Sequence, residues 1–110
     1  MMNFTSQTTA EGATRLLVEG EFGIYHATEI KQRLIDEVRA NPVLELDLSH
    51  VSEMDTAGFQ LLAIAKRESQ RLGSVLRIVG HSTAVREVIE FFNMVAFFGD
   101  PLVIPAGEQG

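Results

Sequence analysis

VLELDLSHVSEMDTAGFQLLAIAKRESQRLGSVLRIV, residues 43–79, holds two strand patterns on either side of a helix pattern. Leucines alternate with other residues over 43–49, which predicts a strand with one face under helices and the other partly wet. A helical pattern follows over about 57–72 and ends at Gly73, a typical C-cap. Residues 75–79 are apolar enough for a second strand, so the stretch predicts a βαβ unit with parallel strands and a right-handed crossover.

Further strand and helix patterns lie on both sides of this unit. Residues 14–19 favour a strand that ends in a turn at Gly20, with a second short strand after it. Apolar residues recur at helical spacing over 27–39, before an Asn-Pro pair stops the helix. Ser82 is a typical N-cap for a third helix, and residues 102–105 predict a last short strand.

These elements predict a single α/β domain. Residues 1–13 are polar and small, so we expect a loose N-terminal segment with room for one short strand. The domain itself should cover residues 14–105, and residues 106–110 should form a flexible tail. No internal repeat or low-complexity linker divides the chain.

The composition disfavours several classes of function. The chain has 110 residues, a formal net charge of −6 and a pI near 4.9, which disfavours a nucleic-acid groove or an anionic membrane surface as partner. It contains no cysteine, so disulfides, thiolate catalysis and cysteine metal sites are excluded. No apolar stretch approaches the roughly 20 residues of a membrane span, and the first residues lack signal-peptide character. We therefore expect a cytoplasmic location without membrane insertion.

The junction Asp55-Thr56-Ala57-Gly58 is open to two interpretations. It lies between a strand end and a helix start, where ligands tend to bind in open α/β sheets and the helix dipole favours an anion. In the first interpretation these residues only cap the helix, which the local pattern favours. In the second, the Thr56 hydroxyl is exposed to carry a phosphoryl group.

Other candidate chemistry is weak. His26, His50 and His81 lie far apart with no second ligand at metal spacing, which favours surface or capping roles. No serine–histidine–aspartate order, glycine-rich phosphate loop or nucleotide fingerprint is present, so we expect no enzyme, no cofactor and no metal. Four carboxylates near one strand end offer either a divalent-ion site or ordinary solvated and capping roles: Glu45, Asp47, Glu53 and Asp55.

Aromatic residues gather late in the chain, at Phe91, Phe92, Phe97 and Phe98, together with Met94. Their density favours a group of core side chains that plugs the end of the sheet, rather than a cofactor-binding site. A small-molecule or self-association site is the less favoured alternative.

Two longer stretches carry motifs that occur together in one known family. They are LELDLSHVSEMDTAGFQLL, residues 44–62, and GSVLRIVGHSTAVREVIEFFNM, residues 73–94. A strand ends in Asp-Leu-Ser, an Asp-Ser/Thr-x-Gly motif opens a helix, and Gly-x-Ser/Thr-x-Ala-Val-Arg leads into a last helix. Over about residues 15–104 the chain resembles the STAS family, the domain of anti-sigma factor antagonists. The resemblance implies a mixed sheet of about four to five strands, with helices mainly packed on one face.

The resemblance also implies a role for Thr56. In that family, the residue after the aspartate accepts phosphate from a serine/threonine kinase of the histidine-kinase-like ATPase superfamily, and a PP2C-type phosphatase removes it. The unmodified form binds the kinase or anti-sigma partner, and the phosphorylated form releases it. Thr56 is then the expected phosphoacceptor, supported by Asp55, Ala57 and Gly58. The expected partner contacts around it are Glu21, Gly23, Glu53 and Gln60.

One segment departs from the pattern of the family. Antagonists of the sporulation type usually follow Gly-Glu-Leu with an aspartate beside the phosphoacceptor, whereas this chain reads Gly20-Glu21-Phe22-Gly23. Thr56 in place of serine looks more like single-domain members linked to chemotaxis and motility signalling. A related Asp-Thr-x-Gly occurs in the STAS subunit of a lipid-transporting ABC system, so an accessory subunit that docks on the ATPase of such a system is the alternative function. A scaffold that is never phosphorylated is a third.

Overall fold

The computed structural model describes residues 2–97, with side chains as far as Asn93. The strand expected at 102–105 and the tail expected at 106–110 lie outside the described residues. Four strands form one sheet, in chain order across its width: β1 (Asn3–Thr8), β2 (Thr14–Phe22), β3 (Val43–Met54) and β4 (Val75–His81). β1 runs antiparallel to β2, and the remaining neighbours are parallel.

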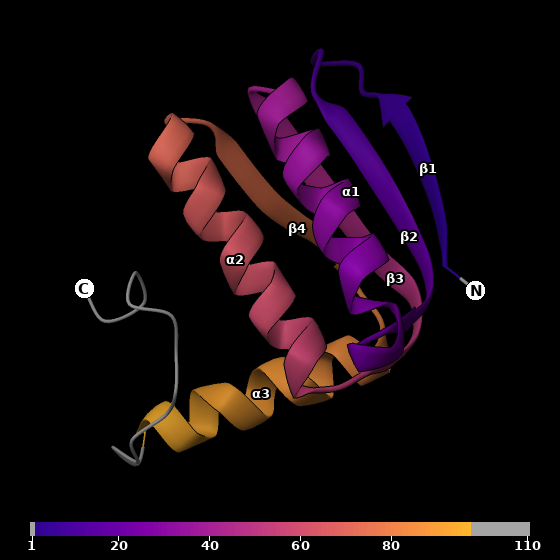
Figure 1. Ribbon diagram of the computed structural model, residues 1–110, viewed down its shortest axis with the longest axis vertical. Coiled ribbons are helices and arrows are strands. Elements are labelled where there is room, and N and C mark those ends of the chain that lie inside the picture. The colour runs from indigo at the N-terminus through magenta and orange to yellow at the C-terminus, as the bar shows by residue number, and fades with distance from the viewer. Residues whose placement is uncertain (1, 98–110) are drawn as a thin grey trace.

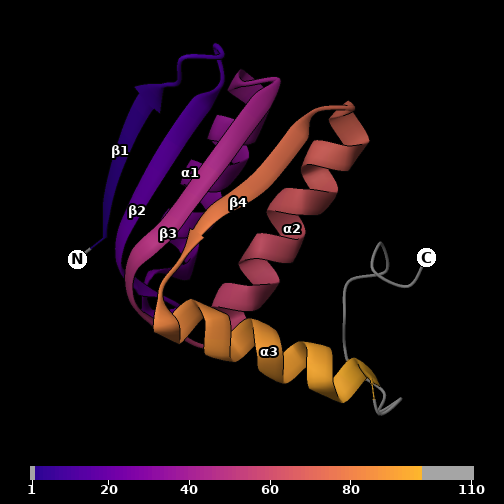
Figure 2. The ribbon, with the colours of Figure 1, turned by 180° about the vertical axis from the view of Figure 1, so that it is seen from behind.

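Two helices cover one face of this sheet. α1 (Ala27–Ala40) and α2 (Thr56–Leu72) lie side by side on it, whereas α3 (Thr83–Phe97) runs across the end of the sheet (Figures 1 and 2). The short 3-10 helix η1 (Ile24–His26) joins β2 to α1. Because β2, β3 and β4 are parallel, their carboxyl ends meet at the end of the sheet where α2 and α3 begin. The prediction of an α/β domain with a mixed sheet and helices mainly on one face is confirmed.

One continuous apolar core lies between the sheet and the two helices. The alternating leucines of β3 point into it, and none is more than 1 % exposed. Burial of each such side chain stabilises the folded state by about 1.5–3 kcal/mol. On α1 the buried residues recur every four positions, as the sequence pattern predicts: Ile30, Leu34 and Val38.

No helix within residues 2–97 lies on the opposite face of the sheet, which carries a charged triad across three strands. Glu45 of β3 accepts hydrogen bonds from Arg15 of β2 at 2.9 Å and from Arg77 of β4 at 3.1 Å. The strand register sets the three residues directly side by side. The hydrogen bond from Arg15, with the help of Arg77, lowers the pKa of the Glu45 carboxyl. This pairing explains how an ionised carboxylate lies largely buried on a β-strand.

The N-terminal region holds the short strand for which the sequence left room. This strand, β1, pairs with β2 along its whole length, and Met2 and Phe4 pack against the core. β2 continues through Gly20 to Phe22, and the predicted turn is absent. Gly20 has a φ of 115° and lies at one of two register irregularities between β2 and β3. It therefore forms a bulge in a conformation that favours glycine, rather than a turn.

β3 is longer than predicted. It runs to Met54, five residues past the expected end at residue 49. The residues expected to form a short connection instead pair with the end of β2, which sets Glu21 opposite Glu53 and Phe22 opposite Met54. This extension brings the end of β2 against the start of α2.

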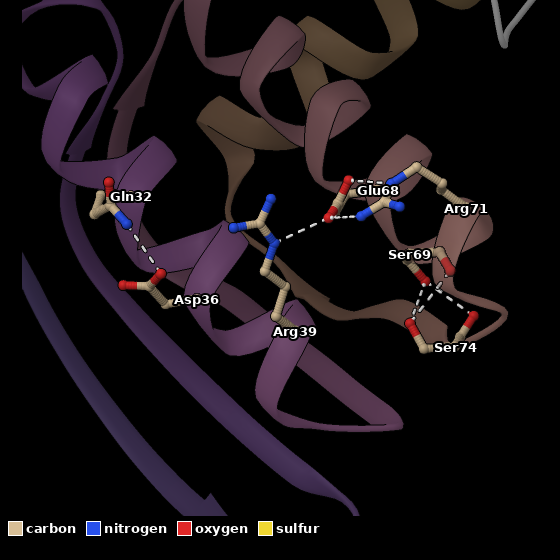
Figure 3. Close-up of polar contacts among 7 residues, drawn as sticks. All are labelled: Gln32, Asp36, Arg39, Glu68, Ser69, Arg71 and Ser74. Carbon is tan, nitrogen blue, oxygen red and sulfur yellow. Dashed lines mark hydrogen bonds and ion pairs between the residues drawn. The ribbon is translucent and has the colours of Figure 1, made fainter.

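The end of α2 is capped as the sequence predicts. Gly73 adopts a left-handed conformation with a φ of 70°, and its N–H donates to the Gln70 carbonyl at 3.1 Å. The Ser74 N–H donates to the Ser69 carbonyl at 2.9 Å, and the Ser69 hydroxyl donates to the Ser74 carbonyl at 2.9 Å (Figure 3). These bonds satisfy carbonyls at the helix end that have no partner within the helix.

The start of α2 lies in very close contact with the end of β2, at Gly58. A β-carbon at this position would overlap the Phe22 carbonyl oxygen and lie 2.9 Å from the Phe22 ring. Glycine is normally unfavourable within a helix by about 1 kcal/mol relative to alanine. The close approach of helix to strand is the reason that this position holds no side chain.

Gly58→Ala should therefore destabilise the domain. In an open helix the same change would stabilise, but overlap with Phe22 should reverse the sign and cost about 1–3 kcal/mol. Urea unfolding of the two proteins measures this difference. Ala57→Gly, in the same turn, is the matched control and should cost only about 0.5–1 kcal/mol. A Gly58→Ala protein as stable as the parent would contradict the close contact.

Glu68 connects the two helices on the face of the sheet. It accepts a hydrogen bond from Arg39 of α1 at 3.0 Å and one from Arg71 of its own helix at 2.7 Å (Figure 3). These partners lower the pKa of the Glu68 carboxyl from 4.5 to about 2, and the hydrogen bond from Arg71 is the largest cause. A carboxylate whose pKa is lowered by folding stabilises the folded state only where it is ionised.

Glu68→Gln should lower the melting temperature near neutral pH by an amount that depends on pH. The difference in melting temperature should be largest above about pH 4.5. It should shrink as the pH falls towards 2, because Glu68 then becomes protonated in the folded state as well as in the unfolded state. Melting curves from pH 7 to pH 2 measure this difference. Glu87→Gln, at an exposed position without an ion-pair partner among residues 2–97, is the control. A difference that stays constant down to pH 2 would contradict the role of the charge.

Candidate functional site

Asp55 joins two segments at the carboxyl end of the sheet. It is the N-cap of α2, and its Oδ1 accepts a hydrogen bond from the Gly58 N–H at 2.9 Å. Its Oδ2 accepts a second one from the Ile24 N–H at 3.0 Å, at the start of η1. Both oxygens of one carboxylate therefore bond to backbone N–H groups, and these bonds fix η1 relative to the first turn of α2.

Gly23 provides the space for this carboxylate. A β-carbon at Gly23 would lie 2.6 Å from Asp55 Oδ2, closer than real side chains approach. The Asp55 side chain therefore occupies the space that a larger residue at position 23 would need.

Thr56 is the first residue of α2 and is exposed. Asp55 caps the helix, as the first of the two interpretations of this junction expects, and Thr56 does not. Within the described part of the chain, no hydrogen bond engages the Thr56 hydroxyl. The hydroxyl is therefore accessible, beside backbone N–H groups whose partial positive charge favours an anion.

The other expected supporting and contact residues fall into two groups. Gly58 is buried and Ala57 half-buried, so they shape the helix start rather than a contact surface. Gln60 is exposed and lies four residues after Thr56, on the same face of α2. The remaining expected contacts, Glu21, Gly23 and Glu53, gather beside Asp55 around a small hollow.

This hollow is acidic. It has a volume of about 100 Å³, and its charged lining residues are Glu21, Glu53 and Asp55, without a basic side chain among them. Glu21 and Glu53 lie opposite one another on β2 and β3, and both are exposed. The arrangement favours a cationic group of a partner and opposes an added anion.

Two exposed apolar residues beside the hollow are absent from the sequence-based site. Ile24 is 65 % and Tyr25 88 % exposed, and both belong to η1. The available signal was their place directly after a glycine and outside the helical apolar stripe that begins later in α1. Exposed aromatic and aliphatic side chains next to charged groups are typical of protein contact surfaces.

The four carboxylates considered for a divalent ion have separate roles. Glu45 pairs with two arginines, and Asp47 accepts hydrogen bonds from Ser49, whose hydroxyl is the largest cause of a lowered Asp47 pKa. Asp55 caps a helix, and Glu53 lines the hollow. Residues 2–97 contain no group of three or more potential metal-binding side chains.

The aromatic residues near the end of α3 are only partly buried. Phe92 stacks on Phe59 of α2 with ring centroids 4.1 Å apart, whereas Phe91 is 57 % exposed. Phe92 therefore packs as expected of the aromatic group, whereas Phe91 stays exposed beside it. The side chains of Met94 and Phe97, and all of Phe98, lie outside what the structure describes. None of the helices described is long and apolar enough to cross a membrane.

Comparison with known proteins identifies this architecture. The family model described as "Mlab, STAS domain" matches residues 5–103. Among curated proteins, none matches the chain significantly. The crystal structure of an anti-sigma factor antagonist from Mycobacterium paratuberculosis is 21 % identical, with a TM-score of 0.74 over 94 % of this chain and 88 % of that one.

Two structures of SpoIIAA have the same fold. The unphosphorylated form is 18 % identical, with a TM-score of 0.63 over 84 % of this chain and 82 % of that chain. The phosphorylated form of the Bacillus protein is 17 % identical, with a TM-score of 0.60 over 86 % of each chain. Because the family model matches nearly the whole chain, this protein belongs to the STAS domain family.

Proposed function

We propose that this protein is a non-enzymatic regulatory binding module of the anti-sigma factor antagonist kind, switched by phosphorylation of Thr56. The observation that carries the proposal is the exposed Thr56 hydroxyl, directly after an aspartate whose carboxylate is fully occupied in holding the helix start. The partners would be a serine/threonine kinase of the histidine-kinase-like ATPase superfamily or an anti-sigma factor, and a PP2C-type phosphatase. Such partners place the protein in the cytoplasm, in a pathway of the chemotaxis or motility kind.

The modification itself needs no catalytic group from this chain. The Thr56 oxygen would attack the γ-phosphorus of ATP bound to the kinase, ADP would leave, and the hydroxyl proton would pass to a base of the kinase. The phosphatase would return the hydroxyl by transferring the phosphoryl group to water. This chain supplies an accessible oxygen on a rigid helix start.

The switch would act on the complex rather than on the fold. Both oxygens of Asp55 bond to backbone groups, so a phosphate on Thr56 has little reason to disturb the helix start. A partner that covers Ile24 and Tyr25 would also cover Thr56, because Asp55 ties η1 to the start of α2. Phosphorylation adds about −1.5 to −2 charges, and burying that dianion without a cationic partner costs several kcal/mol.

The alternative is a STAS accessory subunit that docks permanently on the ATPase of a lipid-transporting ABC system. The acidic hollow favours this alternative, because Glu21, Glu53 and Asp55 would repel a phosphate on Thr56. The exposed Ile24 and Tyr25 suit permanent docking equally well. The two functions differ in whether modification of Thr56 changes binding.

Thr56→Glu should weaken capture of the cellular partner at least about tenfold, which corresponds to about 1.4 kcal/mol. Thr56→Ala should keep binding and abolish phosphate incorporation. Thr83→Glu is the matched control, because Thr83 is the exposed first residue of α3, as Thr56 is of α2. Affinity measured with the purified partner, together with melting curves of all four proteins, makes the test. Equal binding by every variant would replace the switch with permanent docking or a scaffold role.

Tyr25→Ala should weaken partner binding by more than about 1 kcal/mol, since aromatic side chains dominate contact energetics. Its melting temperature should stay close to that of the parent, because Tyr25 is 88 % exposed. Phe91→Ala removes another exposed aromatic, from α3, and should leave binding unchanged. Titration calorimetry with the same purified partner gives the two affinities. Unchanged binding by Tyr25→Ala would remove η1 from the contact surface.

A further inference from the structure

The strand β1 forms one edge of the sheet. It is the first strand in the order of the sheet, so one of its edges has no strand partner within residues 2–97. No helix of the described residues lies beyond that edge either (Figures 1 and 2). An unpaired edge carries a row of backbone N–H and C=O groups, which is a template for another strand. The outer edge of β1 is therefore able to bind an extended segment.

This edge lacks the features by which proteins usually prevent such pairing. Edge strands are normally very short or carry a charged side chain, a proline or a bulge. β1 reads Asn-Phe-Thr-Ser-Gln-Thr over its six residues, without charge or proline. Its register with β2 is continuous, whereas the other two strand pairs contain irregularities. In a chain with a net charge of −6, this edge is regular and uncharged.

The hairpin between β1 and β2 shows which backbone groups face the free edge. The Thr9 N–H donates to the Ala13 carbonyl at 2.8 Å, where the hairpin closes. In an antiparallel ladder every second residue exchanges hydrogen bonds with the neighbouring strand, so the odd-numbered residues of β1 bond to β2. The backbone groups of the even-numbered residues, Phe4, Ser6 and Thr8, therefore point away from β2.

The side chains of the odd-numbered residues lie on the face of the sheet that no described helix covers. Met2 and Phe4 pack against the core, and side chains alternate along a strand. Asn3, Thr5 and Gln7 therefore point to the opposite face, and all three are exposed. Each is neutral and can both donate and accept a hydrogen bond.

This pattern of side chains is complementary to itself. If a second copy pairs antiparallel with Thr5 opposite Thr5, then Asn3 of each copy lies opposite Gln7 of the other. Polar pairs of this kind stabilise neighbouring strands. β2 continues the same rows, because Glu19 lies beside Asn3 and Arg15 beside Gln7. Each row then has Glu19 of one copy at one end and Arg15 of the other copy at the other end, so the charges are complementary.

We propose that two copies of this protein associate through antiparallel pairing of their β1 edges, with Thr5 on the twofold axis. The Phe4 backbone of each copy exchanges hydrogen bonds with Ser6 of the other, and the two sheets become one. Because the paired strands run in opposite directions, the two Thr56 sites lie at opposite ends of the joined sheet. The proposal concerns an edge separate from Thr56 and does not depend on the switch.

Sedimentation equilibrium of the unaltered full chain gives the first test. One strand edge is a small contact compared with the roughly 1,200–2,000 Å² of a stable interface, so the association should be weak and reversible. The average mass should rise from one copy towards two as the concentration goes from micromolar to millimolar. A mass that stays at one copy throughout overturns the proposal.

Ser6→Pro should weaken this association at least about tenfold. Proline at this position removes an N–H that faces the free edge and none that bonds to β2, so the melting temperature should stay close to that of the parent. Sedimentation of the two proteins at equal concentration measures the difference. Equal association of Ser6→Pro and the parent would place the contact elsewhere and overturn the proposal.

Disulfide formation between copies tests the register, because the chain has no cysteine of its own. Thr5→Cys sets two thiols directly opposite one another, with β-carbons about 4.5–5.5 Å apart, close to the geometry of a disulfide. Gln7→Cys is the matched control on the same face of the same strand. Its two thiols are separated along the paired strands, because Gln7 lies opposite Asn3.

Thr5→Cys should form a linked dimer under mild oxidation at least about tenfold faster than Gln7→Cys, because pairing raises the effective concentration of its thiols. Equal rates for the two variants, or no linked dimer from Thr5→Cys, overturn the proposal. If Ser6→Pro does not fold, this comparison still decides.

Discussion

The carboxylate of Asp55 is the interaction on which the site depends. One oxygen holds the first turn of α2 and the other holds the start of η1, at 2.9 and 3.0 Å. These two segments are separated by 31 positions in the chain and meet only because β2 and β3 pair to their carboxyl ends. A single side chain therefore fixes the geometry of the surface at the carboxyl end of the sheet.

Two glycines make that arrangement possible. Gly23 leaves space for the carboxylate, and Gly58 lets the helix approach the Phe22 carbonyl. Because Asp55 caps the helix, the hydroxyl of the neighbouring Thr56 is not needed as a cap, and it makes no hydrogen bond within the described residues. The helix start therefore stays capped by Asp55 while the Thr56 hydroxyl remains exposed.

Much of this fold follows from the sequence because its signals are local. The alternation in β3, the helical spacing of α1 and the glycine after α2 depend on neighbouring residues alone. The bulge at Gly20 and the extra residues of β3 depend on a pairing between β2 and β3, which no local pattern reports. Tyr25 escaped prediction for the same reason, since its place in the site comes from the Asp55 bond to the preceding residue.

The charges around Thr56 determine whether a phosphate there would affect the free domain or its complex with a partner. Glu21 and Glu53 are exposed, and two unit charges about 4 Å apart in water interact by only about 1 kcal/mol. The helix start offsets part of this repulsion, by about 0.3–1 kcal/mol. In the free protein, water weakens the remaining repulsion. Under a partner, water is excluded, the same repulsion grows and the phosphate loses its hydration. A phosphate at Thr56 would therefore be tolerated by the isolated domain and opposed within a complex, which is the asymmetry that a binding switch requires.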